Sequence, residues 1–133
     1  MNAERRFFDT NVLAYFASDD LAKANLAKHL LSLGGTVSVQ VLNELALVMR
    51  RKFAMTWSEI CEILDIMKDL LEVVPVTIDV HESGLRLAER YQLAIYDAMI
   101  IAAALEADCD VLWSDDMQHS MKIGGLEIRN PFV

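Results

Sequence analysis

The sequence predicts a three-layer α/β domain with a central, mainly parallel sheet of four to five strands, forming one domain over residues 1–133. Short apolar runs alternate along the chain with longer segments whose apolar residues recur at helical spacing. This alternation is typical of βαβ units packed into a covered parallel sheet. The length of 133 residues is enough for one core, and no linker, repeat or low-complexity segment divides the chain.

The first third of the chain contains two strands and two helices. Arg6–Asp9 is a short apolar strand. Asn25–Leu33 repeats apolar residues at helical spacing, and Gly34–Gly35 then ends that helix. Thr36–Val39 is short and β-branched, which favours a second strand. Val41–Arg51 is helical again and carries cations in its last turn, where they complement the helix dipole.

The middle of the chain holds the clearest amphipathic helix, Thr56–Leu71, whose first residues form a capping box. Val73–Thr77 is a third strand. Its Pro75 predicts an edge or strand-end position, because proline cannot donate to a ladder. Asp79–Leu93 is a further amphipathic helix.

The last third begins with Tyr96–Ala107, a helix that is apolar nearly all round and is therefore expected to be buried. Asp110–Ser114 is a fourth strand. Leu126–Asn130 is the possible fifth strand of the predicted four to five. Strands that alternate with helices in this way imply right-handed crossovers.

Composition and charge restrict the classes of function. Apolar residues make up 54% of the chain and the formal net charge is −8. That charge argues against binding RNA or DNA through a simple basic surface. No apolar run is long enough to span a membrane, and the first residues do not resemble a signal peptide. We therefore expect a cytoplasmic protein with no membrane partner, in which Cys61 and Cys109 stay reduced.

Several acidic residues follow the predicted strands. Asp9 ends the first strand, and Asp115 and Asp116 follow the fourth. Glu44 lies in the first turn of the helix after the second strand, and Asp97 starts the buried helix. Because ligands of open parallel sheets bind beyond the carboxyl ends of the strands, all of these acids can meet at one edge.

A cluster of carboxylates with no basic partner requires a cation, since like charges raise one another's pKa values. The predicted ligands are all oxygens, which favours Mg²⁺ or Mn²⁺ over Zn²⁺. Ions held in this way can activate water for displacement at phosphorus. The residues by themselves thus predict metal-assisted phosphodiester hydrolysis.

Four motifs in order, "FFDTNVL", "VLNELALV", "YDAMIIAAAL" and "LWSDDMQHS", together with the terminal "NPF", resemble the PIN-domain ribonucleases. The resemblance is strongest to the VapC-type toxins of bacterial toxin–antitoxin pairs and spans nearly the whole chain. It implies a PIN-like fold and a Mg²⁺- or Mn²⁺-dependent endoribonuclease that acts on RNA. It also implies a homodimer and a cognate antitoxin.

The resemblance assigns roles to eight residues. The implied catalytic and metal-binding acids are Asp9, Glu44, Asp97 and Asp116. Asp115 occupies a neighbouring acidic position, so whether Asp115 or Asp116 faces the metal is open. The implied supports of these acids are Thr10, Asn11, Ser114 and Asp115.

Each acid also has a purely structural interpretation. Asp9 could cap a helix, and Asp97 could be a helix cap or a first-turn acid. Glu44 could be a solvated first-turn acid, and Asp115 and Asp116 could form an ordinary turn. Two other functions compete. A haloacid-dehalogenase-like phosphatase also places Asp after its first strand, but that chemistry usually needs a second Asp where this chain has Asn11. The second competing function is a catalytically inactive PIN-fold module that only binds a partner.

The acidic net charge leaves few groups to contact RNA. The basic candidates are Arg5, Arg6, Arg50, Arg51 and Lys52, whose structural alternative is solvated strand and helix ends. An exposed apolar surface on the helices between Leu21 and Leu71 would suit an antitoxin segment. The RNA target stays open, because RNA recognition depends on shape and unstacked bases.

Overall fold

Six short strands form the central sheet of the computed structural model, which describes residues 4–133. The strands are β1 (Arg6–Phe8), β2 (Thr36–Ser38), β3 (Glu72–Val74), β4 (Val111–Trp113), β5 (Lys122–Ile123) and β6 (Leu126–Arg129). Their order across the sheet is β3-β2-β1-β4-β6-β5. Every neighbouring pair is parallel except β5 and β6, which are antiparallel.

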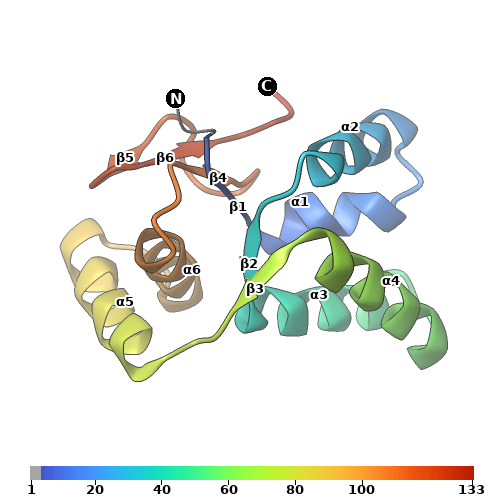
Figure 1. Ribbon diagram of the computed structural model, residues 1–133, viewed down its shortest axis with the longest axis horizontal. Coiled ribbons are helices and arrows are strands. Elements are labelled where there is room, and N and C mark those ends of the chain that lie inside the picture. Colours follow the sequence, from blue (N-terminus) through green and yellow to red (C-terminus); the bar gives the residue numbers. More distant parts are fainter. Residues whose placement is uncertain (1–3) are drawn as a thin grey trace.

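The helices lie in two layers on either side of this sheet. They are α1 (Thr10–Ala14), the 3₁₀ turn η1 (Tyr15–Ala17), α2 (Leu21–Ser32), α3 (Val39–Arg51), α4 (Trp57–Leu70), α5 (Ile78–Tyr91) and α6 (Ile95–Glu106). Figure 1 shows α1–α4 on one side of the strands and the α5–α6 pair on the other. The predicted three-layer α/β class with a mainly parallel sheet is therefore confirmed.

The sheet has one strand more than the four to five predicted. The additional strand, β5, is only two residues long, which is too short for an apolar pattern to reveal. Its antiparallel pairing with β6 places it at an edge of the sheet. The other edge is β3, which ends before Pro75, so the predicted edge position of this strand is confirmed.

Helix starts differ from the sequence prediction because polar caps, rather than apolar spacing, set them. Helix α2 begins at Leu21, since Asp20 caps it by accepting from the Lys23 amide. Ser38 caps α3 in the same way, so this helix begins at Val39. The short helix α1 was not predicted, because five residues give too little periodicity to recognise.

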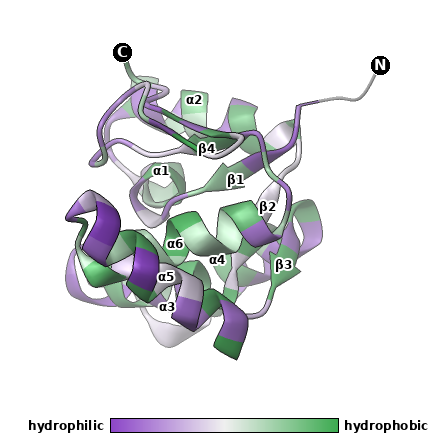
Figure 2. Cartoon of the chain, turned by 90° about the vertical axis from the view of Figure 1, so that its left-hand side faces the viewer, coloured by the Kyte–Doolittle hydropathy of each residue, from purple (hydrophilic) through white to green (hydrophobic). Residues whose placement is uncertain are grey.

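Both faces of β1 are buried, which shows that the sheet is covered on each side. Phe7 and Phe8 point to opposite faces and are both fully buried. Helix α6 has a continuous buried stretch from Ala98 to Ala104, which confirms the expected buried helix. In Figure 2 this helix is largely hydrophobic, whereas α5, which packs on it, carries hydrophilic segments.

The helices found among residues 4–133 include none that combines the length and apolarity needed to cross a bilayer. Cys61 is exposed and Cys109 is buried, and both are free thiols in the structure.

Candidate active site

The carboxyl ends of β1 and β4 bring Asp9 and Asp116 together. The two strands are parallel neighbours with Phe8 opposite Trp113, and the Asp9 amide donates to the Trp113 carbonyl at 2.9 Å. Strand β1 ends at Phe8, one residue earlier than predicted, so that Asp9 occupies the N-cap of α1. Asp9 therefore still lies at the carboxyl end of β1, as predicted, because the residue that follows the strand is also the N-cap of the helix.

One hydroxyl group joins the carboxylates of Asp9 and Asp116. The Ser114 Oγ atom lies 2.8 Å from Asp9 Oδ2 and 3.0 Å from Asp116 Oδ1. A serine hydroxyl has one hydrogen and can donate it to only one of these oxygens at a time. Two ionised carboxylates would therefore be only partly satisfied here, and a proton or a cation is needed between them.

The helix that Asp9 caps supplies two further supports. Asp9 Oδ1 accepts from the Thr10 amide at 2.7 Å, so this carboxylate serves both the helix cap and the acidic cluster. Thr10 Oγ1 donates to Glu44 Oε1 at 3.4 Å, and Asn11 Nδ2 donates to Asp116 Oδ2 at 3.3 Å. Helix α1 therefore links acids that come from three separate segments of the chain.

Glu44 and Asp97 enter the cluster from α3 and α6. Because α3 begins at Val39, Glu44 lies in its second turn, one turn later than predicted. Asp97 lies in the first turn of α6 but is not its cap, which is Ala94 with no side-chain bond. The interpretation of Asp97 as a helix cap is thus wrong, whereas its placement as a first-turn acid agrees with the structure. The interpretation of Glu44 as a first-turn acid is wrong.

Gln40 is a residue of this site that sequence reasoning missed. Its Nε2 donates to Glu44 Oε2 at 3.5 Å and to the Tyr96 carbonyl at 3.2 Å. It therefore fixes Glu44 to the start of α6, next to Asp97. The spacing of Gln40 and Glu44, four residues apart on one helix, was the available signal, since such pairs face each other.

The electrostatics of the cluster favour protonated or cation-bound carboxylates. Burial, followed by the charge of Asp116, raises the pKa of Asp9 from 3.8 to about 8. Burial also raises the pKa of Glu44, and the charges of Asp97 and Asp116 add to the effect. The pKa of Asp97 is raised by burial and then by the charge of Asp116. Burial and the charge of Asp116 thus act in the same direction on all three of these acids.

Asp116 and its neighbour Asp115 have different surroundings. Asp116 contacts Ser114 and Asn11, and its charge raises the pKa values of the other three acids. Asp115 is half-buried, and its Oδ1 atom is buried without a hydrogen-bond partner among the described residues. The structure therefore brings Asp116, rather than Asp115, into contact with the supports of the cluster.

The donors present suit a hard divalent cation that keeps part of its water shell. Within residues 4–133, no three Asp, Glu, His or Cys side chains come close enough together to enclose an ion without movement. Magnesium, however, is commonly bound through only one or two carboxylates plus water. The pair formed by Asp9 and Asp116 meets that requirement, and no Lys, Arg or His in the described part of the chain pairs with either acid.

The basic residues considered for RNA contact lie elsewhere. Arg5 precedes β1 and Arg6 is its first residue, so both lie at the end of this strand that is opposite to Asp9. The side chain of Arg5 donates to the Ala107 carbonyl, and Arg6 pairs with Glu4. Arg50 lies on the face of Trp57, with 4.9 Å from its guanidinium carbon to the ring centroid. The structure thus does not bring Arg5 or Arg6 to the carboxylates.

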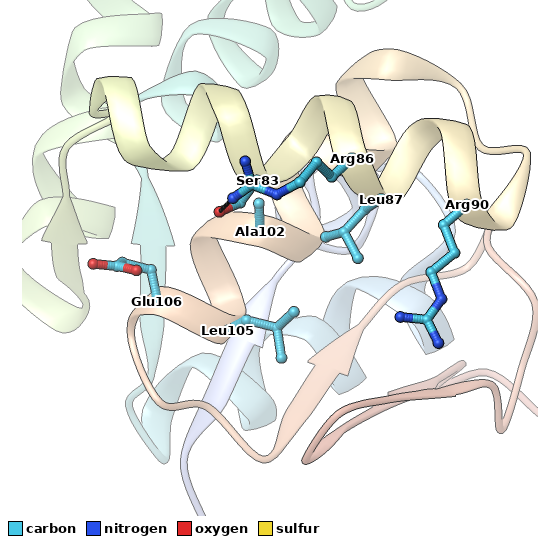
Figure 3. Close-up of a pocket in the computed structure, with 7 residues that line it drawn as sticks. All are labelled: Ser83, Arg86, Leu87, Arg90, Ala102, Leu105 and Glu106. Carbon is cyan, nitrogen blue, oxygen red and sulfur yellow. Dashed lines mark hydrogen bonds between the residues drawn. The ribbon is translucent and has the colours of Figure 1, made fainter.

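A separate cavity of about 470 Å³ lies beside the α5–α6 pair, and Figure 3 shows its lining residues. These are Ser83, Arg86, Leu87, Arg90, Ala102, Leu105 and Glu106. None of the four predicted acids belongs to this cavity. The acids lie instead beyond the carboxyl ends of β1 and β4 and at the starts of the neighbouring helices.

Several large apolar side chains are exposed on the helices between residues 21 and 71, the region that the sequence analysis considered for an antitoxin segment. These side chains are Leu21, Leu33, Val39, Leu47, Trp57, Ile66 and Leu70.

Comparisons with known proteins relate the chain to one family. Residues 6–123 match the family profile described as PIN domain. A search of curated protein sequences gave no match.

Three solved structures share the fold. The first is a toxin–antitoxin complex from Klebsiella pneumoniae, with 21% identity, a TM-score of 0.69, and coverage of 95% of this chain and 97% of that chain. The second is VapC20 of Mycobacterium tuberculosis, described as a sarcin–ricin loop cleaving toxin, with 20% identity, a TM-score of 0.70, and coverage of 84% and 89%. The third is VapBC2 of Rickettsia felis bound to a DNA fragment from their promoter, with 19% identity, a TM-score of 0.62, and coverage of 84% and 87%.

Proposed function

The chain belongs to the PIN-domain family, and from that premise we propose that it is a metal-dependent endoribonuclease and the toxin of a toxin–antitoxin pair. The observation that carries the proposal is the pair of carboxylates, Asp9 and Asp116, that share the single hydroxyl of Ser114. Glu44 and Asp97 surround this pair and have raised pKa values for the same physical reasons. A similar fold in a toxin that cleaves the sarcin–ricin loop supports RNA as the substrate.

Asp9 and Asp116 are the residues that would hold Mg²⁺ or Mn²⁺. When bound, the ion would supply an activated water and would stabilise the charge of an in-line displacement at phosphorus. Ser114 and Asn11 fix the two carboxylates, so that the oxygen ligands are preorganised. Asp115 is assigned a supporting role, because it directly precedes Asp116 and its Oδ1 atom is buried with no hydrogen-bond partner among the described residues.

Glu44 would accept a proton from the attacking water, and Asp97 would complete the group of acids. A raised pKa makes the carboxylate of Glu44 a better proton acceptor than a surface glutamate, which suits removal of a proton from the attacking water. Thr10 and Gln40 hold the two oxygens of Glu44 from opposite sides. Asp97, next to the Gln40–Tyr96 contact, would complete the set of acids through water.

The test of the site compares two first-turn acids in different helices. Asp97→Asn is expected to lower Mg²⁺-dependent cleavage of a structured RNA at least about 100-fold, because it removes a group of the acidic cluster. Asp79→Asn is the matched control, since Asp79 lies in the first turn of α5 and is exposed. Cleavage is measured on gels with Mg²⁺, with Mn²⁺ and with EDTA. Wild-type rates in purified Asp97→Asn would show that the assignment is wrong.

The two competing functions predict different results. A haloacid-dehalogenase-like phosphatase would hydrolyse small phosphate esters and spare RNA. In the structure, Asn11 donates to Asp116 and cannot serve as the second Asp of that chemistry. An inactive binding module would show no heat of Mn²⁺ binding in titration calorimetry, and Asp9→Asn would not change that result.

The proposed partners are an antitoxin and a second copy of the chain. The exposed apolar side chains between Leu21 and Leu70 suit the apolar face of an antitoxin segment. Co-expression with the neighbouring reading frame, followed by co-purification, tests the antitoxin. Light scattering of the purified chain tests the homodimer, and a mass of about 15 kDa, that of one chain, would contradict it.

A further inference from the structure

A lysine and two aromatic rings form a compact cluster outside the carboxylate site. Lys23 Nζ lies 3.4 Å from the Tyr15 hydroxyl and 4.8 Å from the centroid of the Tyr15 ring. The same ammonium lies 5.3 Å from the centroid of the Phe132 ring. The two rings meet edge to face, with centroids 4.8 Å apart. All three side chains are half-buried, so that part of the cluster reaches the surface.

The cluster is tied to the α1 side of the carboxylate site. Tyr15 follows α1 directly, and its amide donates to the Asn11 carbonyl. Residues four apart on a helix lie on the same face, about 6 Å apart along the axis. Tyr15 therefore lies one turn beyond Asn11, whose side chain contacts Asp116.

The cluster is also tied to the segment that carries Asp116. The Phe132 amide donates to Asn130 Oδ1, and the Asn130 amide donates to His119 Nδ1. His119 lies three residues after Asp116 in the same loop. Both rings are thus anchored to elements that position the acids, which places the cluster at the rim of the site.

The positive charge of Lys23 has no acidic partner. No Asp or Glu in residues 4–133 lies within 4.0 Å of its ammonium, although the protein has 20 acidic residues and a net charge of −8. The ammonium is held by ring faces and by a hydroxyl, and neither neutralises it. Its free hydrogen-bond donors can still bind an anion.

We propose that Lys23, Tyr15 and Phe132 form a subsite for the backbone of the RNA strand next to the bond that is cleaved; this inference rests on the proposed ribonuclease function. The Lys23 ammonium and the Tyr15 hydroxyl contact a phosphate. The exposed part of the Phe132 ring offers a surface for the adjoining base or ribose. The subsite also supplies the local positive charge that an acidic protein needs in order to hold RNA at a carboxylate cluster.

The test measures RNA binding rather than cleavage. All variants carry Asp9→Asn so that RNA is not cut, and the probe is a fluorescein-labelled ten-nucleotide single-stranded RNA of mixed sequence. Lys23→Gln is expected to raise Kd about fivefold and to lower the slope of log Kd against log salt by about 0.7, the value for one phosphate contact in a single strand. Tyr15→Phe should raise Kd by a smaller factor.

Lys28→Gln is the matched control. Lys28 lies on the same helix and over the face of another aromatic ring, Phe16, at 5.6 Å from its centroid. Lys28 lies five positions after Lys23, so it points to a different side of the helix. We expect Kd and the salt slope to stay unchanged in this variant. An equal effect of the two substitutions, or no effect of Lys23→Gln, would overturn the subsite and leave the cluster as a protein contact or a clasp for residues 130–132.

Two further measurements distinguish RNA binding by Lys23 from a purely structural role of this residue. A merely structural role would lower the thermal midpoint without changing the salt slope, and that result also contradicts the proposal. In proteins that retain Asp9, Lys23→Gln should raise KM for RNA and leave kcat nearly unchanged. If wild-type protein cleaves RNA but Lys23→Gln behaves like wild type, only the subsite fails. If wild-type protein neither binds nor cleaves RNA, the proposed function fails first.

Discussion

Replacing Asp9 by Asn should stabilise the metal-free protein. Asp9 is 4% exposed, and its pKa is raised from 3.8 to about 8 by burial and by Asp116. At pH 7 a shift of this size corresponds to about 4 kcal/mol, because each pKa unit is worth about 1.4 kcal/mol. An Asn amide can accept from the Thr10 amide and donate to Ser114, so it fits the same position without a charge.

The stabilisation should depend on pH with a definite sign. Between about pH 4 and pH 8 the folded protein binds more protons than the unfolded chain, so wild-type stability falls as the pH rises through this window. We expect Asp9→Asn to recover about half of the 4 kcal/mol at pH 7, because the new amide is also buried. For a domain of this size that corresponds to a rise in Tm of about 8 °C. Near pH 4 the difference should disappear.

The assay is thermal unfolding in EDTA from pH 4 to pH 8, followed by circular dichroism. Asp20→Asn is the matched control, since Asp20 also caps a helix but is exposed. Its Tm should stay within about 2 °C of wild type, because Asp and Asn cap equally well. Adding Mn²⁺ should then raise the Tm of wild type and not that of Asp9→Asn. A lower Tm for Asp9→Asn at pH 7 in EDTA would refute the reasoning.

Two further substitutions test the site and the fold. Ser114→Ala removes the hydroxyl between the two carboxylates, so we expect Mn²⁺ affinity to fall about tenfold in titration calorimetry; unchanged affinity would contradict the role given to this serine. Gly84→Ala should lower the free energy of unfolding in urea by about 1–3 kcal/mol, because the added Cβ would lie 2.4 Å from Met99 Sδ. Combining Gly84→Ala with Met99→Ala should relieve that clash, so the double variant should lose less stability than the two single variants together. A loss in the double variant equal to the sum of the two single losses would show that the clash is not the cause.

Local sequence patterns were enough to predict most elements and the placement of the acids. Strands follow from short β-branched and apolar runs, and helices such as α4 follow from apolar spacing and a capping box that the structure confirms. Because parallel strands end at the same edge of a sheet, Asp9 and Asp116 could be expected at one edge before the fold was known. The elements that escaped prediction, α1, η1 and β5, are too short to carry a period.

The first residue of each helix and the order of the strands could not be predicted from the spacing of apolar residues. A single polar side chain such as Asp20 or Ser38 decides where a helix begins, and its role becomes visible only when its hydrogen bond is seen. The order β3-β2-β1-β4-β6-β5 joins strands that are distant in the chain, and it follows from how the helices cover the sheet.

The sequence by itself determined the chemistry of this protein, and the tertiary structure decided how that chemistry is arranged. Residue type and position relative to the strands were sufficient to expect a group of acids at one end of the sheet and to predict oxygen ligation of a divalent ion, and the family resemblance selected four of these acids. Only the fold could place Ser114 between Asp9 and Asp116 and give Asp116 and Asp115 different surroundings. The physical reason is that the burial of Asp9 and its contact with Ser114 depend on residues 105 positions apart, whereas caps and periodicity depend on neighbours in sequence.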